Sequence, residues 1–136
     1  MEKIYDMIII GGGPAGLSAG IYGGRAKLDV LVIEKENKGG QISLTSEVVN
    51  YPGILEISGT EFMTQTRKQA EGFGVNFVQG EVVDMDFTKD IKTIKTKDAE
   101  YSALSVVIAT GAAPRKLGFP GEQEFTVRGV AYCATC

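Results

Sequence analysis

The sequence has no histidine and only two cysteines in 136 residues. A structural zinc site normally needs four nitrogen or sulfur ligands, so zinc and other metals are not expected within this chain. The cysteines, Cys133 and Cys136, lie three positions apart. A disulfide across so short a loop would hardly restrict the unfolded chain, so the pair does not serve as a fold-stabilising cross-link.

Long apolar runs and positive charge are also scarce. The longest apolar run near the N-terminus is MIII, which glycines follow at once. We therefore expect no membrane segment and no targeting signal, and a cytoplasmic location. Lys and Arg number 14 against 17 Asp and Glu, a net charge of -3 with no basic cluster. Nucleic acid is therefore not an expected partner.

The N-terminal third has the pattern of a βαβ unit. Residues 5–10 form a short buried strand run, residues 14–26 a helix with Pro14 at its first position, and residues 29–34 a second strand. A crossover this short requires the two strands to be parallel neighbours. The length fits one domain or an incomplete larger one.

The rest of the chain predicts a second αβ unit and a meander. Residues 37–59 are irregular, and a capping box at Ser58 begins a helix to about Phe73, with Phe62, Thr66, Ala70 and Phe73 on one face. Strands follow at 75–78, then an antiparallel meander at 81–87, 91–96 and 100–104, and a final core strand at 104–111. The Pro- and Gly-containing segment after Ala112 predicts a domain boundary there.

A glycine turn between the first strand and helix predicts nucleotide binding. Gly11, Gly13 and Gly16 match G-x-G-x-x-G, which places a pyrophosphate on the helix N-terminus. Alone, the motif also fits an ordinary tight turn. Glu34 ends the next strand 18 residues after Gly16, where a carboxylate can accept from ribose hydroxyls. Its charge disfavours a 2'-phosphate, which favours FAD or NAD over NADP.

The C-x-x-C pair predicts thiol chemistry. In an α/β protein such a pair is most simply a dithiol that cycles with a disulfide, and two ordinary buried cysteines are the alternative. Because the chain has no histidine, a nearby flavin, a helix N-terminus or residues beyond Cys136 would have to activate the thiol. A nucleotide site and a dithiol together indicate a flavoprotein that reduces disulfides.

Five motifs carry a resemblance to a known family. The segments IIIGGGPAGLSAGIYGGRA, KGGQI, EVVNYPG, VVIATGAAPRKLGFPGE and GVAYCATC resemble, in this order, the N-terminal portion of low-molecular-weight thioredoxin reductases. The resemblance implies an α/β fold: a Rossmann-like FAD-binding domain with three layers in the order β, β, α. Its parallel sheet has an antiparallel β-meander as a crossover. It also implies that this domain is incomplete here, with residues 1–112 its N-terminal segment and 113–136 an inter-domain crossing and the start of a second, redox domain.

The same resemblance implies roles for individual residues. In the family pattern the second cysteine, Cys136, faces the flavin, and Cys133 exchanges with the disulfide of thioredoxin. The residues expected at the FAD pyrophosphate are Gly11, Gly12, Gly13, Pro14, Ala15 and Gly16. Glu34 is expected at the ribose, and the backbone near Val82 at adenine. At the flavin end the resemblance places Gly40, Gln41 and Asn50, with Thr110 and Gly111 beside the cofactor.

By the same resemblance, the family's NADPH site lies outside this chain, thioredoxin is the partner, and the full-length protein is a homodimer. The resemblance makes the chain the N-terminal segment of a longer reductase, inactive in isolation. Two relatives within the fold stay open, the flavoprotein reductase of a peroxidase system and a ferredoxin-linked reductase. A non-catalytic nucleotide-binding fragment is the alternative from a different class.

Overall fold

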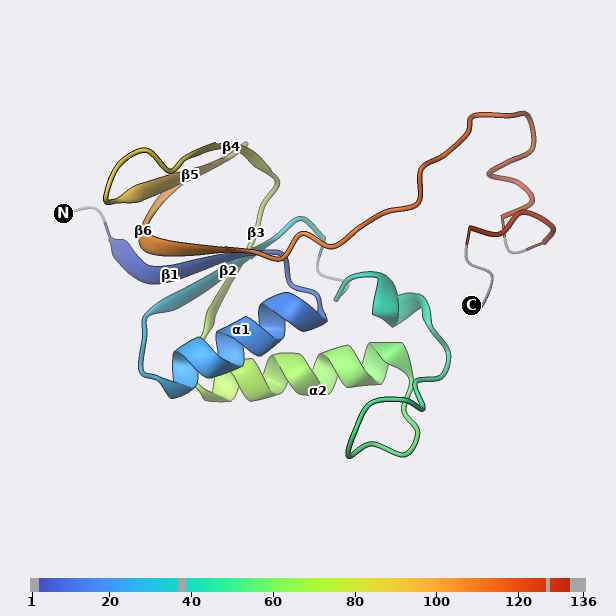
Figure 1. Ribbon diagram of the computed structural model, residues 1–136, viewed down its shortest axis with the longest axis horizontal. Helices are drawn as coiled ribbons and strands as arrows, with labels where there is room; N and C mark the ends of the chain where they lie inside the picture. The colour runs from blue at the N-terminus through green and yellow to red at the C-terminus, as the bar shows by residue number, and fades with distance from the viewer. Residues whose placement is uncertain (1–2, 37–38, 127, 133–136) are drawn as a thin grey trace.

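The computed structural model describes residues 3–36, 39–126 and 128–132 (Figure 1). The N-terminal unit is strand β1 (Ile4–Ile10), helix α1 (Pro14–Arg25) and strand β2 (Val30–Glu34), as predicted. The remaining elements are the short 3-10 helix η1 (Gln41–Leu44), helix α2 (Gly59–Gly72), and strands β3 (Asn76–Gln79), β4 (Val82–Asp86), β5 (Lys92–Thr96) and β6 (Glu100–Ile108). No helix in the described ranges is long and apolar enough to cross a membrane.

All six strands join one mixed sheet in the order β3-β2-β1-β6-β5-β4. Strand β1 lies at its centre, where Ile8 pairs with Leu31 of β2 and Val106 of β6 in parallel. Strands β4, β5 and β6 pair in antiparallel fashion, which confirms the predicted meander. The parallel strands therefore bring their carboxyl ends to a single edge.

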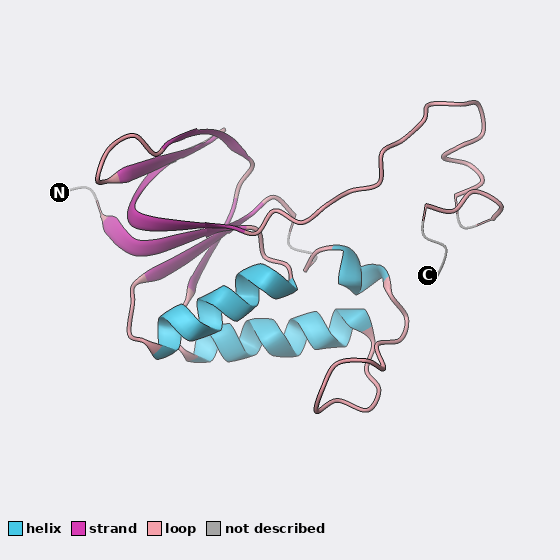
Figure 2. Cartoon of the chain, in the orientation of Figure 1, coloured by secondary structure: helices cyan, strands magenta, loops and turns pink. Residues whose placement is uncertain are grey.

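The predicted three layers are confirmed by the packing (Figure 2). Helices α1 and α2 cover one face of the parallel strands, and the meander folds over the other. Because side chains alternate along a strand, Ile8 and Ile10 pack toward Ile94 of the meander, whereas Ile9 packs toward Ala70 of α2. Both faces of β1 are thus buried, as its continuous apolar run requires.

Strand β6 differs from the prediction. The sequence predicts a third meander strand at 100–104 and a separate core strand at 104–111, but one strand runs unbroken from Glu100 to Ile108. Its first part pairs with β5 as far as Ala103, and residues from Ser102 onward pair with β1. One strand serves both layers because no glycine or proline interrupts it.

Helix α2 begins where the capping box predicts. The Ser58 hydroxyl accepts a hydrogen bond from the backbone N–H of Glu61 at 3.2 Å. The inward face is made by Phe62, Met63 and Ala70. Phe73, which the prediction places on this face, lies at the helix C-cap and is 40% exposed.

The irregular segment before α2 is held against the helix. The backbone of Val48 pairs with that of Ile57 in an isolated bridge, and the Thr60 hydroxyl donates to the carbonyl of Ser43 at 3.0 Å. These contacts anchor the segment, although Leu44 and Leu55 within it are exposed.

Beyond β6 the chain leaves the body of the protein, and residues 111–120 are all exposed (Figure 1). The predicted redox pair, Cys133 and Cys136, lies outside the described residues.

Candidate functional site

The carboxyl ends of three parallel strands meet at the glycine turn. The Gly11 N–H donates to the carbonyl of Ile33 at 2.8 Å, and the Ala109 N–H donates to that of Ile10 at 2.8 Å. The turn after β1 is therefore flanked by the ends of β2 and β6. Open α/β sheets bind ligands at this kind of edge.

At Gly11 and Gly16 the space for a side chain is filled by backbone atoms of the protein. Gly11 has a φ of 112°, and a Cβ on it would overlap the carbonyl group of Ala109. A Cβ on Gly16 would overlap the carbonyl oxygen of Gly11. These two positions set the tight turn and the close helix packing that the motif predicts.

Gly13 is different, because a Cβ there would meet no protein atom within 4 Å. It is the N-cap of α1, with Pro14 at the first helical position, and no side chain in the described part of the chain caps the helix. The first turn also carries no acidic residue. Its backbone N–H groups and the positive end of the helix dipole therefore face open space, an arrangement suited to a phosphate.

Two predicted segments lie beside this turn. A Cβ on Gly40 would come within 3.4 Å of the Gly13 Cα, and the Gln41 side-chain amide donates to the carbonyl of Ala112. Gly40 and Gln41 therefore lie next to the strand exit that contains Thr110 and Gly111. Asn50 is exposed in the irregular segment. Val82 begins β4, two residues after Gly80, and the Gly80 N–H donates to the Glu34 carbonyl at 2.9 Å.

Glu34 is 5% exposed and forms a salt bridge with Arg67 of α2. Arg67 also donates through Nε to Glu71 at 3.1 Å, and its guanidinium carbon lies 4.1 Å from the ring centroid of Phe77. Burial lowers the pKa of Arg67, but the hydrogen bonds to Glu34 and Glu71 outweigh it and hold that pKa above its ordinary value. The buried carboxylate therefore has a fixed cationic partner.

The sequence reasoning missed Arg67, although a signal was present. Arg67 follows Met63 by four positions and precedes Ala70 by three, so it falls on the inward face of α2. An arginine on a buried face needs a carboxylate partner, and Glu34 supplies it. Because Arg67 offsets the charge of Glu34, the predicted repulsion of a 2'-phosphate is weaker than Glu34 alone would make it.

A pocket of about 530 Å³ opens beside Glu34. It lies between the glycine turn, the segment around η1 and the outer part of α2. Its lining comprises Gly12, Leu17, Glu34, Gly39, Ser43, Leu44, Thr60, Met63, Thr64, Arg67, Lys68 and Glu71. Only Gly12 and Glu34 of these are among the predicted cofactor residues, so α2 contributes a wall that the sequence did not indicate.

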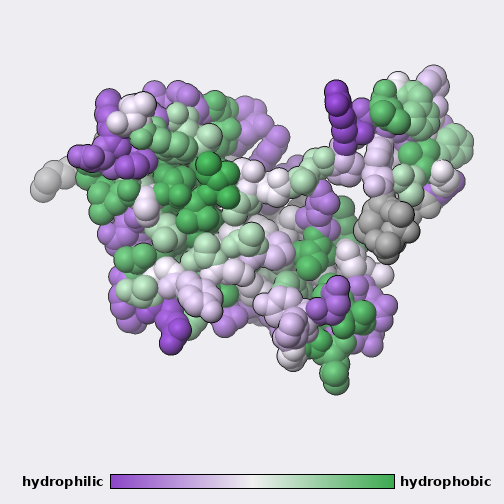
Figure 3. All heavy atoms as spheres, in the orientation of Figure 1, coloured by the Kyte–Doolittle hydropathy of each residue, from purple (hydrophilic) through white to green (hydrophobic). Residues whose placement is uncertain are grey.

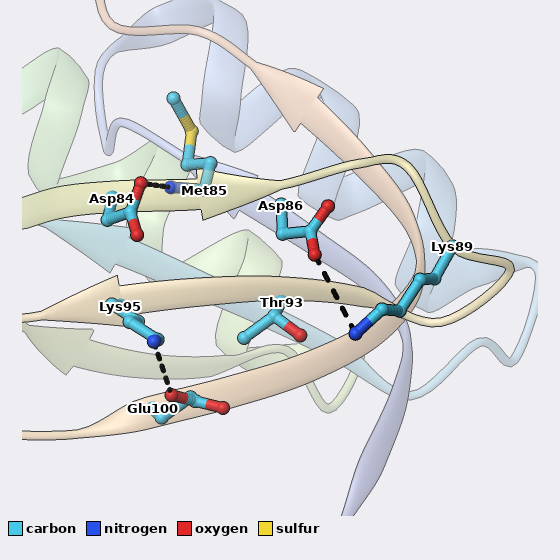
Figure 4. Close-up of a pocket in the computed structure, with 7 residues that line it drawn as sticks. All are labelled: Asp84, Met85, Asp86, Lys89, Thr93, Lys95 and Glu100. Atoms are coloured by element: carbon cyan, nitrogen blue, oxygen red, sulfur yellow. Dashed lines mark hydrogen bonds and ion pairs between the residues drawn. The ribbon is translucent and has the colours of Figure 1, made fainter.

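A smaller pocket of about 230 Å³ lies on the meander, between residues of β4, β5 and the start of β6 (Figure 4). Its charged groups pair with one another, Lys95 with Glu100 at 3.4 Å and Lys89 with Asp86 at 3.9 Å. The lining carries three carboxylates against two lysines, and each lysine is paired with one of these carboxylates. We assign no chemistry to this pocket.

The segment that precedes the cysteine pair folds around Glu122, which is 3% exposed. Its carboxylate accepts from the backbone N–H groups of Leu117 at 2.8 Å and Gly118 at 2.6 Å, and from the Tyr132 hydroxyl. The bond from Tyr132 is the main cause of a lowered Glu122 pKa, and the same bond raises the pKa of Tyr132. Glu122 therefore fixes the position of the residue directly before Cys133.

Comparison with known proteins gives a consistent result. The sequence pattern of the pyridine nucleotide-disulphide oxidoreductase family matches residues 5–136. The chain is 53% identical over 137 aligned positions to a thioredoxin reductase of Peptoclostridium acidaminophilum, covering 100% of this chain and 44% of that protein. It is 45% identical to a thioredoxin reductase of Bacillus subtilis, covering 99% of this chain and 43% of the relative.

Solved structures agree with the sequences. The crystal structure of thioredoxin reductase from Streptococcus pyogenes superposes with a TM-score of 0.88 at 44% identity, covering 100% of this chain and 44% of that one. The Lactococcus lactis thioredoxin reductase gives a TM-score of 0.84 at 44% identity, with 97% and 44% covered. The chain thus spans less than half the length of the curated relatives it matches.

Proposed function

Because the chain belongs to the pyridine nucleotide-disulphide oxidoreductase family, we propose that it forms the FAD-binding part of a thioredoxin-disulfide reductase. The observation that carries the proposal is the meeting of three strand ends at a glycine turn, with a buried carboxylate at the end of β2. This arrangement suits a dinucleotide, since it offers helix N–H groups for phosphate and an acceptor for ribose.

The residues present fit FAD. Gly13 leaves open space in front of the uncapped start of α1, which supports placement of the pyrophosphate over Gly11, Gly12, Gly13, Pro14, Ala15 and Gly16. Glu34 would accept from the ribose, and the backbone near Val82 would contact adenine. Gly40, Gln41 and Asn50 would lie at the flavin end, with Thr110 and Gly111 beside the cofactor.

FAD, when bound, supplies two-electron transfer between a reduced donor and a disulfide. The protein's own share of the chemistry falls to Cys133 and Cys136. The Cys133 thiolate attacks the thioredoxin disulfide and forms a mixed disulfide, releasing one thioredoxin thiolate. Cys136 then attacks Cys133, which releases the second thioredoxin thiolate and leaves Cys133 and Cys136 as a disulfide. Two electrons thus pass from the pair to thioredoxin.

The wider setting belongs to the same proposal. NADPH would bind outside this chain and serve as the donor, the whole protein would be a cytoplasmic homodimer, and residues 113–136 would cross from the FAD domain of residues 1–112 into a second domain. The full exposure of residues 111–120 supports a crossing at that point.

Two measurements test the function. Titration of the chain with FAD, followed by flavin fluorescence, should show saturable binding, and its absence would contradict the FAD site. In the whole protein, Cys136→Ser should abolish thioredoxin reduction while FAD stays bound. Retained thioredoxin reduction in that variant would contradict the assigned role of the cysteine pair, whatever the outcome of the titration.

A further inference from the structure

Among the described residues, Glu34, Glu71 and Phe77 hold the Arg67 side chain in place. Its Nη1 donates to Oε1 of Glu34, its Nε donates to Oε1 of Glu71 at 3.1 Å, and its Cζ lies over the Phe77 ring, 4.1 Å from the centroid. A planar guanidinium bonded at two of its nitrogens and stacked on a ring has little rotational freedom left. Its side chain is only 28% exposed.

The two carboxylate oxygens of Glu34 have different surroundings. Oε1 is the atom that Arg67 bonds. Oε2 lies against the glycine turn, so close that a Cβ on Gly12 would overlap it. No donor in the described residues bonds Oε2. Since no fully buried side-chain oxygen in that part of the protein lacks a partner, Oε2 keeps access to the pocket that Gly12 and Glu34 line.

We propose that Arg67 is a positioning residue for the adenosine ribose: by anchoring Oε1 of Glu34 it presents Oε2 to a ribose hydroxyl. The inference rests on the proposed FAD site and adds a residue of α2 to it. A glutamate has three rotatable side-chain bonds, and an unanchored carboxylate would lose more rotamer freedom on accepting the ribose. Arg67 removes that cost before the ligand arrives.

Arg67 also reduces the repulsion between a bound pyrophosphate and the Glu34 carboxylate. A dinucleotide pyrophosphate is negatively charged, and it would lie near the buried Glu34 carboxylate at the same strand edge. Two like charges at short range in a partly desolvated site repel strongly. The guanidinium offsets the carboxylate charge without occupying the oxygen that faces the pocket.

Arg67 could instead compete with the ribose for Glu34, so that the ribose must displace it. This role predicts the opposite change in FAD affinity when Arg67 is removed. In that case removal of Arg67 would tighten FAD binding. The geometry favours positioning, because Arg67 bonds Oε1 and leaves Oε2 available.

The test compares FAD with its analogue that carries 2'-deoxyadenosine, both titrated by flavin fluorescence. The wild-type chain should bind FAD about tenfold more tightly than the deoxy analogue, since a hydrogen bond to a charged acceptor is lost. Arg67→Met keeps an unbranched side chain over Phe77 but removes the anchor. It should weaken FAD binding about tenfold and bring the ratio between the two ligands close to one.

The ratio separates positioning from a merely structural role, because general damage to the site would weaken both ligands and leave their ratio unchanged. Arg25→Met is the matched control: it removes the same charge from an exposed position in the last turn of α1 and should keep the wild-type ratio. If Arg67→Met does not give the wild-type circular dichroism spectrum, Arg67→Lys replaces it. Lysine keeps the charge but not the planar anchor, and should lose most of the discrimination.

The outcomes separate failure of the FAD site from failure of the role of Arg67. No saturable FAD binding by the wild-type chain would overturn the proposed FAD site and this inference with it. If the wild-type chain binds FAD, two results would overturn the role of Arg67 alone. One is an Arg67→Met variant with the wild-type ratio of affinities for FAD and the deoxy analogue, and the other is a variant that binds FAD more tightly than wild type.

Discussion

Gly13 and Gly16 stand in the same turn for different physical reasons. Gly16 has no room for a Cβ because the Gly11 carbonyl oxygen fills the space, whereas Gly13 faces no protein atom and has an ordinary φ of -78°. The fold of the protein itself therefore requires a glycine at position 16. A glycine at position 13 is required only if a ligand occupies the space in front of it.

This difference predicts opposite results for two substitutions. Gly13→Ser should keep or slightly raise the free energy of unfolding, because serine is a good N-cap for α1. The same serine would occupy the phosphate space and the helix N–H groups, and should weaken FAD binding by at least about tenfold. Gly16→Ala should lower the free energy of unfolding by about 1–3 kcal/mol through overlap with Gly11.

Urea unfolding and FAD titration of both variants measure these effects. Gly20→Ala is a suitable control, since a Cβ there would have ordinary contacts of 3.6 Å or more. Wild-type FAD affinity in a folded Gly13→Ser variant would contradict the pyrophosphate position.

Local sequence patterns were sufficient for part of the candidate site. Gly11, Gly16 and Glu34 could be predicted because a turn and a strand end are short-range features. Arg67 could not, since its partner lies 33 positions away and only the packing of α2 on the sheet brings them together. A charged residue on a predicted buried helix face indicates an ion pair with a distant residue, and Arg67 on α2 is such a residue.

At the scale of elements, an ion triad links three segments near the strand ends. Glu81, just before β4, is paired with Lys35, just after β2, at 2.7 Å, and with Lys97, just after β5. The hydrogen bonds from Lys35 and Lys97 lower the pKa of Glu81 from 4.5 to about 2. The triad therefore ties the meander to the parallel strands while Glu81 is ionised.

A dependence of stability on pH follows from this shift. Because the folded pKa of Glu81 is below its unfolded value, the stabilisation is fully present above about pH 4.5 and is lost as the pH falls toward 2. Glu81→Gln should unfold at a lower temperature than wild type at pH 6.5, and the difference in Tm should shrink at pH 3 and below. The pairs are exposed to solvent, so 1 M NaCl should also reduce it.

Melting curves by circular dichroism at both pH values provide the measurement. A second exposed carboxylate with no ion pair in the described structure, Glu56→Gln, serves as the control and should show no such pH dependence. A Tm difference between Glu81→Gln and wild type that stays constant from pH 6.5 to pH 3 would contradict the triad.

The elements themselves were largely predictable, and β6 shows the limit. Periodicity and turn residues identify where strands occur, but they do not identify partners. Residues 100–108 pair with β5 at one end and with β1 at the other, and this change of partner has no local signal. The prediction therefore divided at Leu104 a strand that is continuous.

At the scale of the whole molecule, the second half of β6 leaves one edge unpaired in the described chain. Pairing with β5 ends at Ala103, and from Leu104 to Ile108 only β1 lies alongside. Leu104 is 54% exposed and Ile108 is 61% exposed. Figure 3 shows apolar surface gathered over the strands between the meander and the helices. An exposed edge with apolar side chains is a site at which chains associate.

We therefore expect the 136-residue chain to self-associate through this edge. Leu104→Lys should raise the apparent dissociation constant of self-association about tenfold or more, because a lysine on an edge strand opposes pairing with another strand. Leu55→Lys changes a leucine that is 96% exposed in the irregular segment before α2, and should leave association unchanged. Sedimentation velocity over a range of concentrations measures both. A wild-type chain that stays monomeric would contradict the predicted self-association. A Leu104→Lys variant that sediments like an associating wild type would show that the β6 edge does not drive it.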